Sequence, residues 1–264
     1  MRVQMTSAAA RTGRVNEDFT GATASAAVLL DGAGIPGAEA VCRHGVAWYA
    51  HRLGGCLLGL LPLRDDRSLA AVLAEAITQV TGEHRDTCDV ADPISPSATV
   101  AMLRISSGLV EYLVLGDTVV VLDMSHGAPL VVTDPRELVI SRSYQPAYEA
   151  AAEGSDERRR ALRELRAHRN APGGFWLAKD DPRAADEALT GSRPVPELSG
   201  AVLLSNGAGR FVDRFGLTDW PGLLALLASS GPAEVVRRVR QAEARDAVAA
   251  DDATIAYCTG IDES

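Results

Sequence analysis

The chain has 264 residues and a formal charge of −9, from 26 Lys and Arg against 35 Asp and Glu. Its composition, 47% hydrophobic and 23% charged, excludes a disordered chain, a collagen and a disulfide-rich scaffold. The acidic balance argues against a general nucleic-acid or anionic-membrane binder, because the affinity of such proteins comes largely from basic side chains. The length allows a sizeable core. Length alone allows one or two domains; the motifs described below, which extend over almost the whole chain, make one domain over residues 1–264 our expectation.

The lack of a recognisable targeting signal and the spacing of the cysteines predict a cytoplasmic protein. Residues 1–10 are polar and lack the apolar run of a signal peptide, and the most apolar stretch, 54–63, has about half the length that spans a bilayer. One lysine against 25 arginines, with many alanines, indicates a bacterial genome rich in G and C. Reduced, buried thiols are expected because the four cysteines show no CxxC metal or redox spacing. They are Cys42, Cys56, Cys88 and Cys258.

Apolar patterning predicts alternating groups of strands and helices. Short apolar runs predict strands at residues 25–30, 99–105, 109–115, 119–122, 201–204 and 253–258. Apolar or amphipathic helical spacing predicts helices at residues 39–61, 68–81, 156–170, 220–227 and 233–248. Ser68 is the expected N-cap of the second helix, and Ser106-Ser107-Gly108 the turn of a hairpin. The order does not fit a βαβ repeat and favours two antiparallel sheets flanked by helices.

Residues 141–200 differ in character and are predicted to form a helical, Arg-rich insert. Between residues 156 and 170 there are six arginines, at positions 158, 159, 160, 163, 166 and 169, and the breaker Ala-Pro-Gly-Gly follows. A solvated helix face accounts for such a run of charge. A flexible basic flap beside a phosphate site is the alternative, and the sequence leaves both open.

Carboxylates recur at the ends of the predicted strands. They occur at Glu17-Asp18 ahead of the first strong strand, Asp31-Gly32 at its end, Gly116-Asp117 at the end of another, and Asp251-Asp252 at the start of the last. Strand ends deliver side chains to one edge of a sheet, where Mg²⁺ or Mn²⁺ can collect carboxylate and carbonyl oxygens. Each Asp-Gly pair by itself is typical of a turn, and spacing alone does not show that these positions meet.

Six segments then follow one another in a familiar order from about residue 5 to 258. They are Gly13-Arg-Val-Asn-Glu-Asp18, Val28-Leu-Leu-Asp-Gly32, Pro96-Ser-Ala-Thr-Val100, Leu113-Val-Leu-Gly-Asp-Thr118, Leu203-Leu-Ser-Asn-Gly207 and Asp251-Asp-Ala-Thr-Ile255. They resemble the motifs of the metal-dependent protein phosphatases, the type 2C serine/threonine phosphatases. The resemblance implies an α+β fold in which two antiparallel β-sheets pack as a sandwich flanked by antiparallel helix pairs, with two Mn or Mg ions at one edge.

The resemblance also implies metal ligands. Asp31 would bridge the two ions, and the carbonyl of Gly32 would bind one of them. Glu17 would reach the second ion, with Asp18 nearby holding metal-bound water. Asp251 would bind the first ion. Water activated by the ions would attack the phosphorus in line, without a phospho-enzyme intermediate.

The substrate phosphate would be gripped by an arginine, since a guanidinium binds phosphate bidentately. Arg14 is the candidate, although the family's arginine stands one residue further from the Glu-Asp pair, so Arg11 or a shifted Arg14 fits. No histidine falls in a matched motif, and we interpret all five as surface or packing residues. They are His44, His51, His84, His126 and His168.

Asn206 is the main departure from the family pattern, because it stands where the family has a metal-binding Asp. An amide oxygen can coordinate Mg or Mn but brings no charge, which predicts a weakened first metal site. Asn-Gly also suits a corner between a strand and a turn. Asp252 replaces the family's closing Asn and adds a carboxylate that could compensate. After Asp31-Gly32, Ala-Gly-Ile replaces the usual His/Met-Gly-Gly.

Three functions remain open at this point. The first is a phosphatase acting on phosphoserine, phosphothreonine or a related phosphomonoester. The second is a pseudophosphatase, a regulatory or binding module with a weakened metal site. The third is another metal-assisted reaction of the same fold on a small molecule, because a fold does not fix a function. We expect a phosphoprotein or small phosphomonoester as partner, no nucleic acid and no membrane; the oligomeric state is open.

Overall fold

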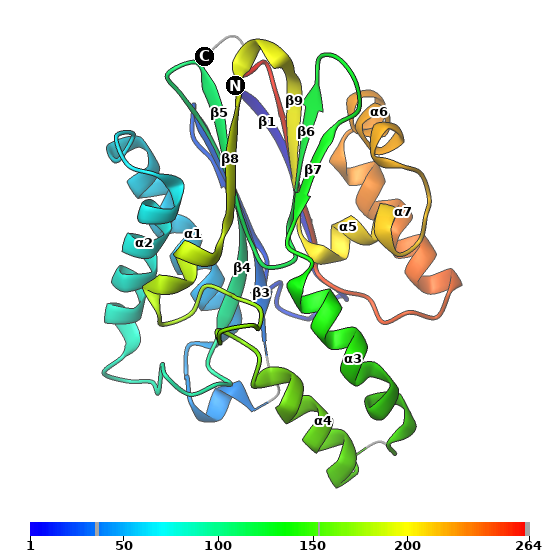
Figure 1. The fold of residues 1–264 in the computed structure, drawn as a ribbon. Coiled ribbons are helices and arrows are strands. Elements are labelled where there is room, and N and C mark those ends of the chain that lie inside the picture. The colour runs from blue at the N-terminus through cyan, green and yellow to red at the C-terminus, as the bar shows by residue number, and fades with distance from the viewer. Residues whose placement is uncertain (35–36, 153, 262–264) are drawn as a thin grey trace.

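Two five-stranded antiparallel β-sheets form the centre of the computed structural model, which describes residues 1–34, 37–152 and 154–261 (Figure 1). The first sheet has the strand order β1 (Arg2–Ala8), β10 (Ala253–Thr259), β9 (Leu198–Leu204), β6 (Val119–Met124) and β7 (Leu130–Thr133). The second has the order β2 (Phe19–Ala22), β3 (Ala26–Ala33), β4 (Ser97–Ser106), β5 (Leu109–Leu115) and β8 (Leu189–Pro194). The sheets enclose an apolar layer, so the predicted α+β sandwich is confirmed.

Helices cover both outer faces of this sandwich (Figure 1). The second sheet is covered by α1 (Gly45–Leu60) and α2 (Leu69–His84), and the first by α5 (Asn206–Asp213), α6 (Trp220–Ser230) and α7 (Pro232–Arg245). Two further helices, α3 (Arg136–Ala150) and α4 (Asp156–Arg166), pack together and extend from one end. Short 3₁₀ turns are η1 (Ala38–Ala40), η2 (Leu61–Leu63), η3 (Pro182–Glu187) and η4 (Val195–Glu197). In the described ranges, no helix has the length and apolar character needed to cross a bilayer.

The central strands are apolar throughout because both of their faces are buried. In β3, Val28 and Leu30 pack under α1 and α2, whereas Ala27 and Leu29 point between the two sheets. Successive side chains of a strand point to opposite faces. A strand covered on both faces therefore reads as a continuous apolar run, which is the pattern that made β3 predictable.

All six predicted strands are present, as β3, β4, β5, β6, β9 and β10. The predicted hairpin joins β4 to β5, and its turn places Ser107 and Gly108 at φ of 52° and 75°. The predicted N-cap is also confirmed, since the Ser68 hydroxyl accepts the Ala71 N–H at 3.2 Å. The helix expected from residue 39 starts only at Gly45, whose φ of +80° interrupts the helical path.

The turn expected at Asp31-Gly32 is wrong. β3 continues through both residues, with Asp31 opposite Thr99 and Gly32 opposite Ala98 on β4. A side chain at Gly32 would collide with Glu17, because a Cβ built there lies 2.5 Å from the Glu17 carbonyl oxygen. Glycine is therefore needed here for close approach of two backbones, not for a turn.

Four strands and two helices were not predicted. The strands β1, β2, β7 and β8 are short or partly exposed and stand at or near sheet edges, so their apolar alternation is weak. The helices are α3 and α5. In α3 no side chain is fully buried and a proline, Pro146, lies inside the helix, which obscures the helical pattern.

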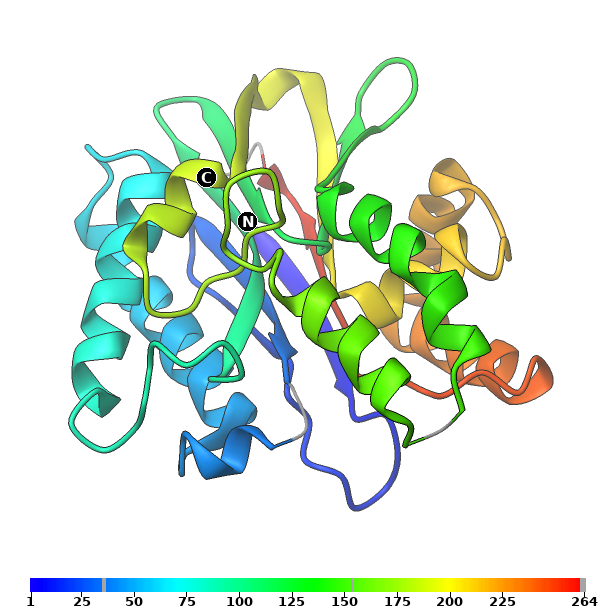
Figure 2. The ribbon, with the colours of Figure 1, turned by 60° about the horizontal axis from the view of Figure 1, so that its bottom comes forward.

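Several loops and element ends converge at one end of the sandwich (Figure 2). The end of β3, the start of β4, the loop after β5 and the start of β10 meet there. The first turns of α3 and α5 reach the same place, so that residues far apart in the sequence line one cavity.

Candidate active site

A cavity of about 290 Å³ at this end of the sandwich is lined mainly by acidic side chains. Six carboxylates line it: Glu17, Asp31, Asp117, Glu137, Asp251 and Asp252. Arg14, Gly32, Thr99, Arg169 and Asn206 complete most of its wall. Of the residues that the sequence predicted as a site, all but Asp18 line this cavity. The carboxylates at the strand ends do meet.

Asp31 has the most strongly perturbed surroundings in the cavity. Burial, followed by the nearby charges of Asp18 and Asp117, raises the pKa of Asp31 well above its usual range. The backbone N–H of Asn206 donates to Asp31 Oδ2 at 3.0 Å and offsets only part of this effect. Like charges gathered in a low-dielectric environment require protons or a counter-cation.

Asp18 lies behind the cavity wall, 3% exposed, and belongs to the same charge cluster. The side-chain hydroxyls of Ser205 and Thr254 lower the pKa of Asp18, but neither makes a hydrogen bond of regular geometry to its carboxylate oxygens. Burial raises the pKa of this carboxyl to about 7. A buried carboxylate without a partner is costly unless a proton or a cation compensates it. The oxygen-only donor set around Asp18 and Asp31 fits a hard cation such as Mg²⁺ or Mn²⁺.

Asp252 holds the loop that carries Glu17. Its two carboxylate oxygens accept the backbone N–H groups of Ala10 and Glu17, each at 2.7 Å. Burial is also the largest cause that raises the pKa of Glu17, against the opposing charge of Arg14. The extra carboxylate noticed in the sequence therefore positions Glu17 at the cavity.

Arg14 and Arg11 behave differently. Arg14 lines the cavity and its Nη2 lies 3.4 Å from Glu17 Oε2, with 45% of the side chain exposed. Arg11 is exposed, does not line the cavity, and only accepts the Arg14 N–H through its carbonyl at 3.1 Å. Between the two arginines left open by the sequence, the structure favours Arg14.

Asn206 begins α5 two residues after the end of β9, so it stands at a corner where the strand passes into a helix instead of a turn. Its backbone N–H points to Asp31, and its side-chain Nδ2 donates to Asp117 Oδ2 at 2.7 Å. The positive end of the helix dipole adds to this attraction for carboxylates. Gly207 is required here, because a Cβ would lie 2.0 Å from the Asp252 carbonyl oxygen.

Asp251 lies at the rim of the cavity. Arg210 Nη2 donates to its Oδ2 at 2.6 Å, and the Asp252 N–H donates to its Oδ1 at 3.0 Å. The side chain is 43% exposed. Asp251 is therefore the most accessible of the predicted metal ligands and already carries a cationic partner.

Sequence reasoning missed two acidic residues of the cavity. Asp117 belongs to a motif that was noticed but given no role; burial raises its pKa, and Gly116 before it has a φ of +80°. Glu137, from α3, has its pKa raised to about 7 by burial and by Asp117. No local pattern marks Glu137, because only the fold of α3 against the sandwich brings it to the cavity.

Arg169 is the third missed residue, and it comes from the Arg-rich segment. Its Nη1 donates to Ser97 Oγ at 3.3 Å, and its buried Nε has no partner among the described residues. Burial lowers its pKa, and the charges of Glu137 and Asp117 act in the opposite direction. One arginine of the predicted solvated face is thus directed into the acidic cavity.

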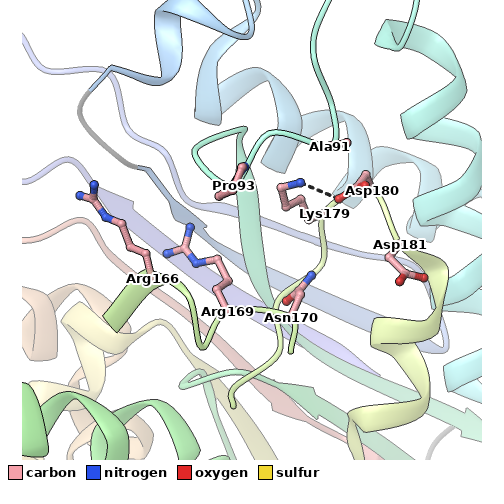
Figure 3. Close-up of a pocket in the computed structure, with 8 residues that line it drawn as sticks. All are labelled: Ala91, Pro93, Arg166, Arg169, Asn170, Lys179, Asp180 and Asp181. Atoms are coloured by element: carbon pink, nitrogen blue, oxygen red, sulfur yellow. Dashed lines mark hydrogen bonds and ion pairs between the residues drawn. The ribbon is translucent and has the colours of Figure 1, made fainter. Parts of the chain in front are cut away.

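A second pocket, of about 220 Å³, adjoins the first and shares Arg169 with it (Figure 3). Its wall is Ala91, Pro93, Arg166, Arg169, Asn170, Lys179, Asp180 and Asp181. Lys179 Nζ donates to Asp180 Oδ1 and to the Val90 carbonyl, each at 2.6 Å, so its charge is compensated. Arg166 and Arg169 stand on the other side of the pocket (Figure 3). An anion that bridges the two pockets would meet both arginines.

No family model and no curated protein matches this sequence. Solved structures match its fold over nearly the whole chain. The catalytic domain of the serine/threonine protein phosphatase PstP in complex with two manganese ions is 16% identical, with a TM-score of 0.57 over 98% of this chain and 97% of that one. PstP of Mycobacterium tuberculosis gives 15% and 0.58, with 98% and 97% covered. A Staphylococcus aureus serine/threonine phosphatase gives 14% and 0.60, with 97% and 94% covered. This chain has the type 2C phosphatase fold.

Proposed function

We propose that this chain is a metal-dependent phosphatase that hydrolyses phosphoserine, phosphothreonine or a related phosphomonoester. One observation carries the proposal: six carboxylates line a single cavity, and a seventh, Asp18, is buried behind it with no regular hydrogen bond among the described residues. Such a cluster needs cations. The likeness in fold to serine/threonine phosphatases, one of them a complex with two manganese ions, supports this choice of chemistry.

The residues proposed to hold Mn²⁺ or Mg²⁺ are those at the base of the cavity. Asp31, Glu17, Asp251, the Asn206 amide oxygen and the Gly32 carbonyl are the ligands, with Asp18 behind them to hold water. When bound, a pair of such ions activates water for in-line attack on phosphorus and stabilises the leaving oxygen. The buried carboxylates keep the ligand set rigid, because β3 and the start of α5 fix their backbones.

The substrate phosphate is proposed to lie between the carboxylates and the arginines. Arg14 stands on one side of the cavity and Arg169 on another. Both can bind phosphate oxygens bidentately. Because Arg169 also lines the second pocket, the residues flanking a phosphoserine or phosphothreonine would meet Arg166 and the loop at Ala91 and Pro93. The Arg-rich segment is then a substrate-facing flap.

The remaining expectations are part of this proposal. We propose a single domain over residues 1–264, in which the segment at about 141–200 is an insert that carries the flap. A bacterial, cytoplasmic protein is proposed from the arginine-rich composition and from four cysteines without CxxC spacing. The expected partner is a phosphoprotein or a small phosphomonoester, with no nucleic acid and no membrane.

A regulatory binding module is the second candidate, and Asn206 favours it. Its backbone and side-chain N–H groups donate to Asp31 and Asp117 and so compensate part of the negative charge without a metal ion. A chain that binds metal weakly through such a site would recognise phosphorylated partners without turning them over.

The test is Mn²⁺-dependent hydrolysis of an aryl phosphate and of phosphoserine and phosphothreonine peptides. We expect weak activity in the wild type, none in Asp31→Asn, and unchanged activity in Asp123→Asn, which alters a carboxylate at the far end of β6. Background activity in both the wild type and Asn206→Asp at saturating Mn²⁺ would refute the phosphatase. Peptide binding without turnover would establish the binding module instead.

A further inference from the structure

Two cysteine and two histidine side chains meet near the start of α1 and the end of α2, in a cluster that does not line the acidic cavity and that the proposed function does not use. Cys42 and His44 precede α1, His84 is the last residue of α2, and Cys88 lies in the loop that follows. One ligand atom from each lies within 4.8 Å of all the others. Among the described residues, this is the one group of His, Cys, Asp and Glu side chains whose ligand atoms come this close together.

The distances match a tetrahedral metal site. Cys42 Sγ lies 3.7 Å from His84 Nδ1 and 3.9 Å from His44 Nδ1, and His44 Nδ1 lies 3.3 Å from Cys88 Sγ. Zinc bonds of about 2.3 Å to sulfur and 2.0–2.1 Å to nitrogen separate neighbouring ligand atoms by about 3.3–3.8 Å in a tetrahedron. A small adjustment of side chains, not of backbone, would therefore complete the coordination.

The surroundings of the cluster are those of a built site. The Thr87 hydroxyl lies 3.8 Å from the Cys88 sulfur, within hydrogen-bonding distance, and it also donates to the His84 carbonyl at 3.2 Å. Such hydrogen bonds stabilise thiolates and orient metal ligands. Cys42 and His84 are buried, with exposed fractions of 1% and 3%. The Trp48 ring stacks on His44 at a centroid distance of 4.4 Å and shields the cluster on one side.

We propose that Cys42, His44, His84 and Cys88 form a structural zinc site. Two thiolates and two imidazoles suit Zn²⁺ and disfavour Mg²⁺ and Mn²⁺, which prefer oxygen. Four protein ligands leave no open coordination position, which distinguishes a structural from a catalytic zinc site. The ion is thus assigned a role in holding elements together, independent of the proposed phosphatase reaction.

The elements that this ion would join border the second pocket. The segment from Cys88 leads directly to Ala91 and Pro93, which line that pocket. The Asp89 N–H donates to the Val41 carbonyl at 2.9 Å, and Lys179 donates to the Val90 carbonyl. A zinc ion between α1 and α2 would therefore fix the loop that faces the proposed flap.

The test is the zinc content of the full chain, purified under reducing conditions without chelators or a metal-binding tag. We expect about one zinc ion per chain in the wild type after dialysis. Loss of one ligand in Cys88→Ser or His84→Gln should lower retained zinc at least about tenfold, since even outer partners of ligands change affinity by about 10–100-fold. Cys56→Ser is the matched control, because Cys56 lies on α1 outside the cluster, and it should retain the zinc.

Two further measurements separate this site from the carboxylate cavity and from misfolding. Zinc retained by Asp31→Asn assigns the ion to the cysteines and histidines, whereas zinc lost only in Asp31→Asn overturns the proposal. Co²⁺ added to the zinc-free wild type should give intense thiolate charge-transfer absorption, which oxygen ligands do not produce. This readout decides the matter even if a variant unfolds. No zinc after reconstitution, full zinc in Cys88→Ser, or a Cys42–Cys88 disulfide in the reduced preparation would also overturn it.

Discussion

The acidic cavity and the cysteine-histidine cluster differ in the charge that they carry when no cation is bound. In the cavity, six carboxylates and the buried Asp18 form an excess of negative charge that only protons or cations can compensate. In the cluster, imidazoles and thiols can remain neutral when no ion is bound. The cavity therefore depends on an ion to relieve repulsion, whereas the cluster would gain cross-links from one.

The two regions also differ in how the chain assembles them. The cavity takes Glu17, Asp31, Asp117, Glu137 and Asp251 from five separate segments, which meet only when both sheets are in place. The cluster is made of two local pairs, one before α1 and one at the end of α2, and a single helix pair brings them together. An ion in the cluster would thus stabilise the helix pair on one side of the fold, and an ion in the cavity would stabilise the end of the sandwich where the carboxylates meet.

The largest expected effect breaks the cavity and spares the cluster. Asp31→Asn removes the charge of the most central carboxylate, and we expect activity to fall at least about a hundredfold, because changes that only touch the partners of metal ligands already cost about 10–100-fold. Calorimetric titration with Mn²⁺ should show the loss of binding. Unchanged Mn²⁺ stoichiometry in this variant would contradict the role of Asp31.

The second prediction concerns a substitution that removes a ligand from the cluster and leaves the cavity unchanged. Cys88→Ser should lower the melting temperature by at least about 5 °C, the equivalent of about 2 kcal/mol for a chain of this size, because the link between α1 and α2 is lost. Calorimetry and Mn²⁺ titration would measure both properties. Cys56→Ser serves as the control, and an equal shift in that variant would mean that the cysteine substitution itself, not a lost ion, lowers stability.

The pH dependence of the free energy of unfolding is a third difference between the two regions, and we expect it to amount to a few kcal/mol. Burial raises the pKa of Asp18 to about 7, so the folded chain holds this proton more tightly than the unfolded chain. The resulting stabilisation is present at low pH and is lost as the pH rises from about 4 through 7. Without added Mn²⁺, stability should fall over this range, and Mn²⁺ should restore more of it at pH 7.5 than at pH 5.5. Urea unfolding measures this. Asp18→Asn should reduce the slope without abolishing it, because the pKa values of Asp31, Asp117 and Glu137 are raised as well.

How well each region could be predicted follows from the same physics. Asp31, Glu17 and Asp251 could be found because they adjoin buried strands, whose apolar runs are visible in the sequence, and because they sit in motifs of fixed order. Glu137 and Arg169 could not, because they come from a polar helical segment that reaches the cavity only through tertiary packing.

The cluster was missed for a different reason. Cysteine spacing alone does not reveal it, because Cys42 and Cys88 are far apart in the sequence. The local signal is the mixed spacing of two pairs: Cys42 and His44 are two residues apart, and His84 and Cys88 are four residues apart. All four residues were assigned to ordinary packing, and only the contact between α1 and α2 shows that the pairs converge.

The substitution Asn206→Asp adds a negative charge to the cavity and tests how that charge affects stability and metal binding. The new carboxylate would stand where an amide now donates to Asp117 at 2.7 Å, so two carboxylates would face each other. Without metal the variant should be less stable than the wild type, and with Mn²⁺ it should bind the ion more tightly and turn over about tenfold faster, as expected for a gain of about 1.4 kcal/mol. Melting temperatures with and without Mn²⁺, and aryl phosphate kinetics, test both signs. Asn206→Ala, which adds no charge, should show neither gain.

The smallest expected effect concerns the arginine that connects the two pockets. Arg169→Ala removes a guanidinium directed at the cavity without touching any proposed metal ligand, so the KM for a phosphopeptide should rise about three- to tenfold, the equivalent of about 0.7–1.4 kcal/mol, with little change in kcat. Arg163→Ala removes an exposed arginine of the same segment and should leave both constants unchanged. If the two variants behave alike, Arg169 does not bind the substrate phosphate. A rise in KM confined to Arg169→Ala would instead mean that the insert contributes one specific phosphate contact while its other charges remain in solvent, which is the arrangement that the unpartnered Nε of Arg169 indicates.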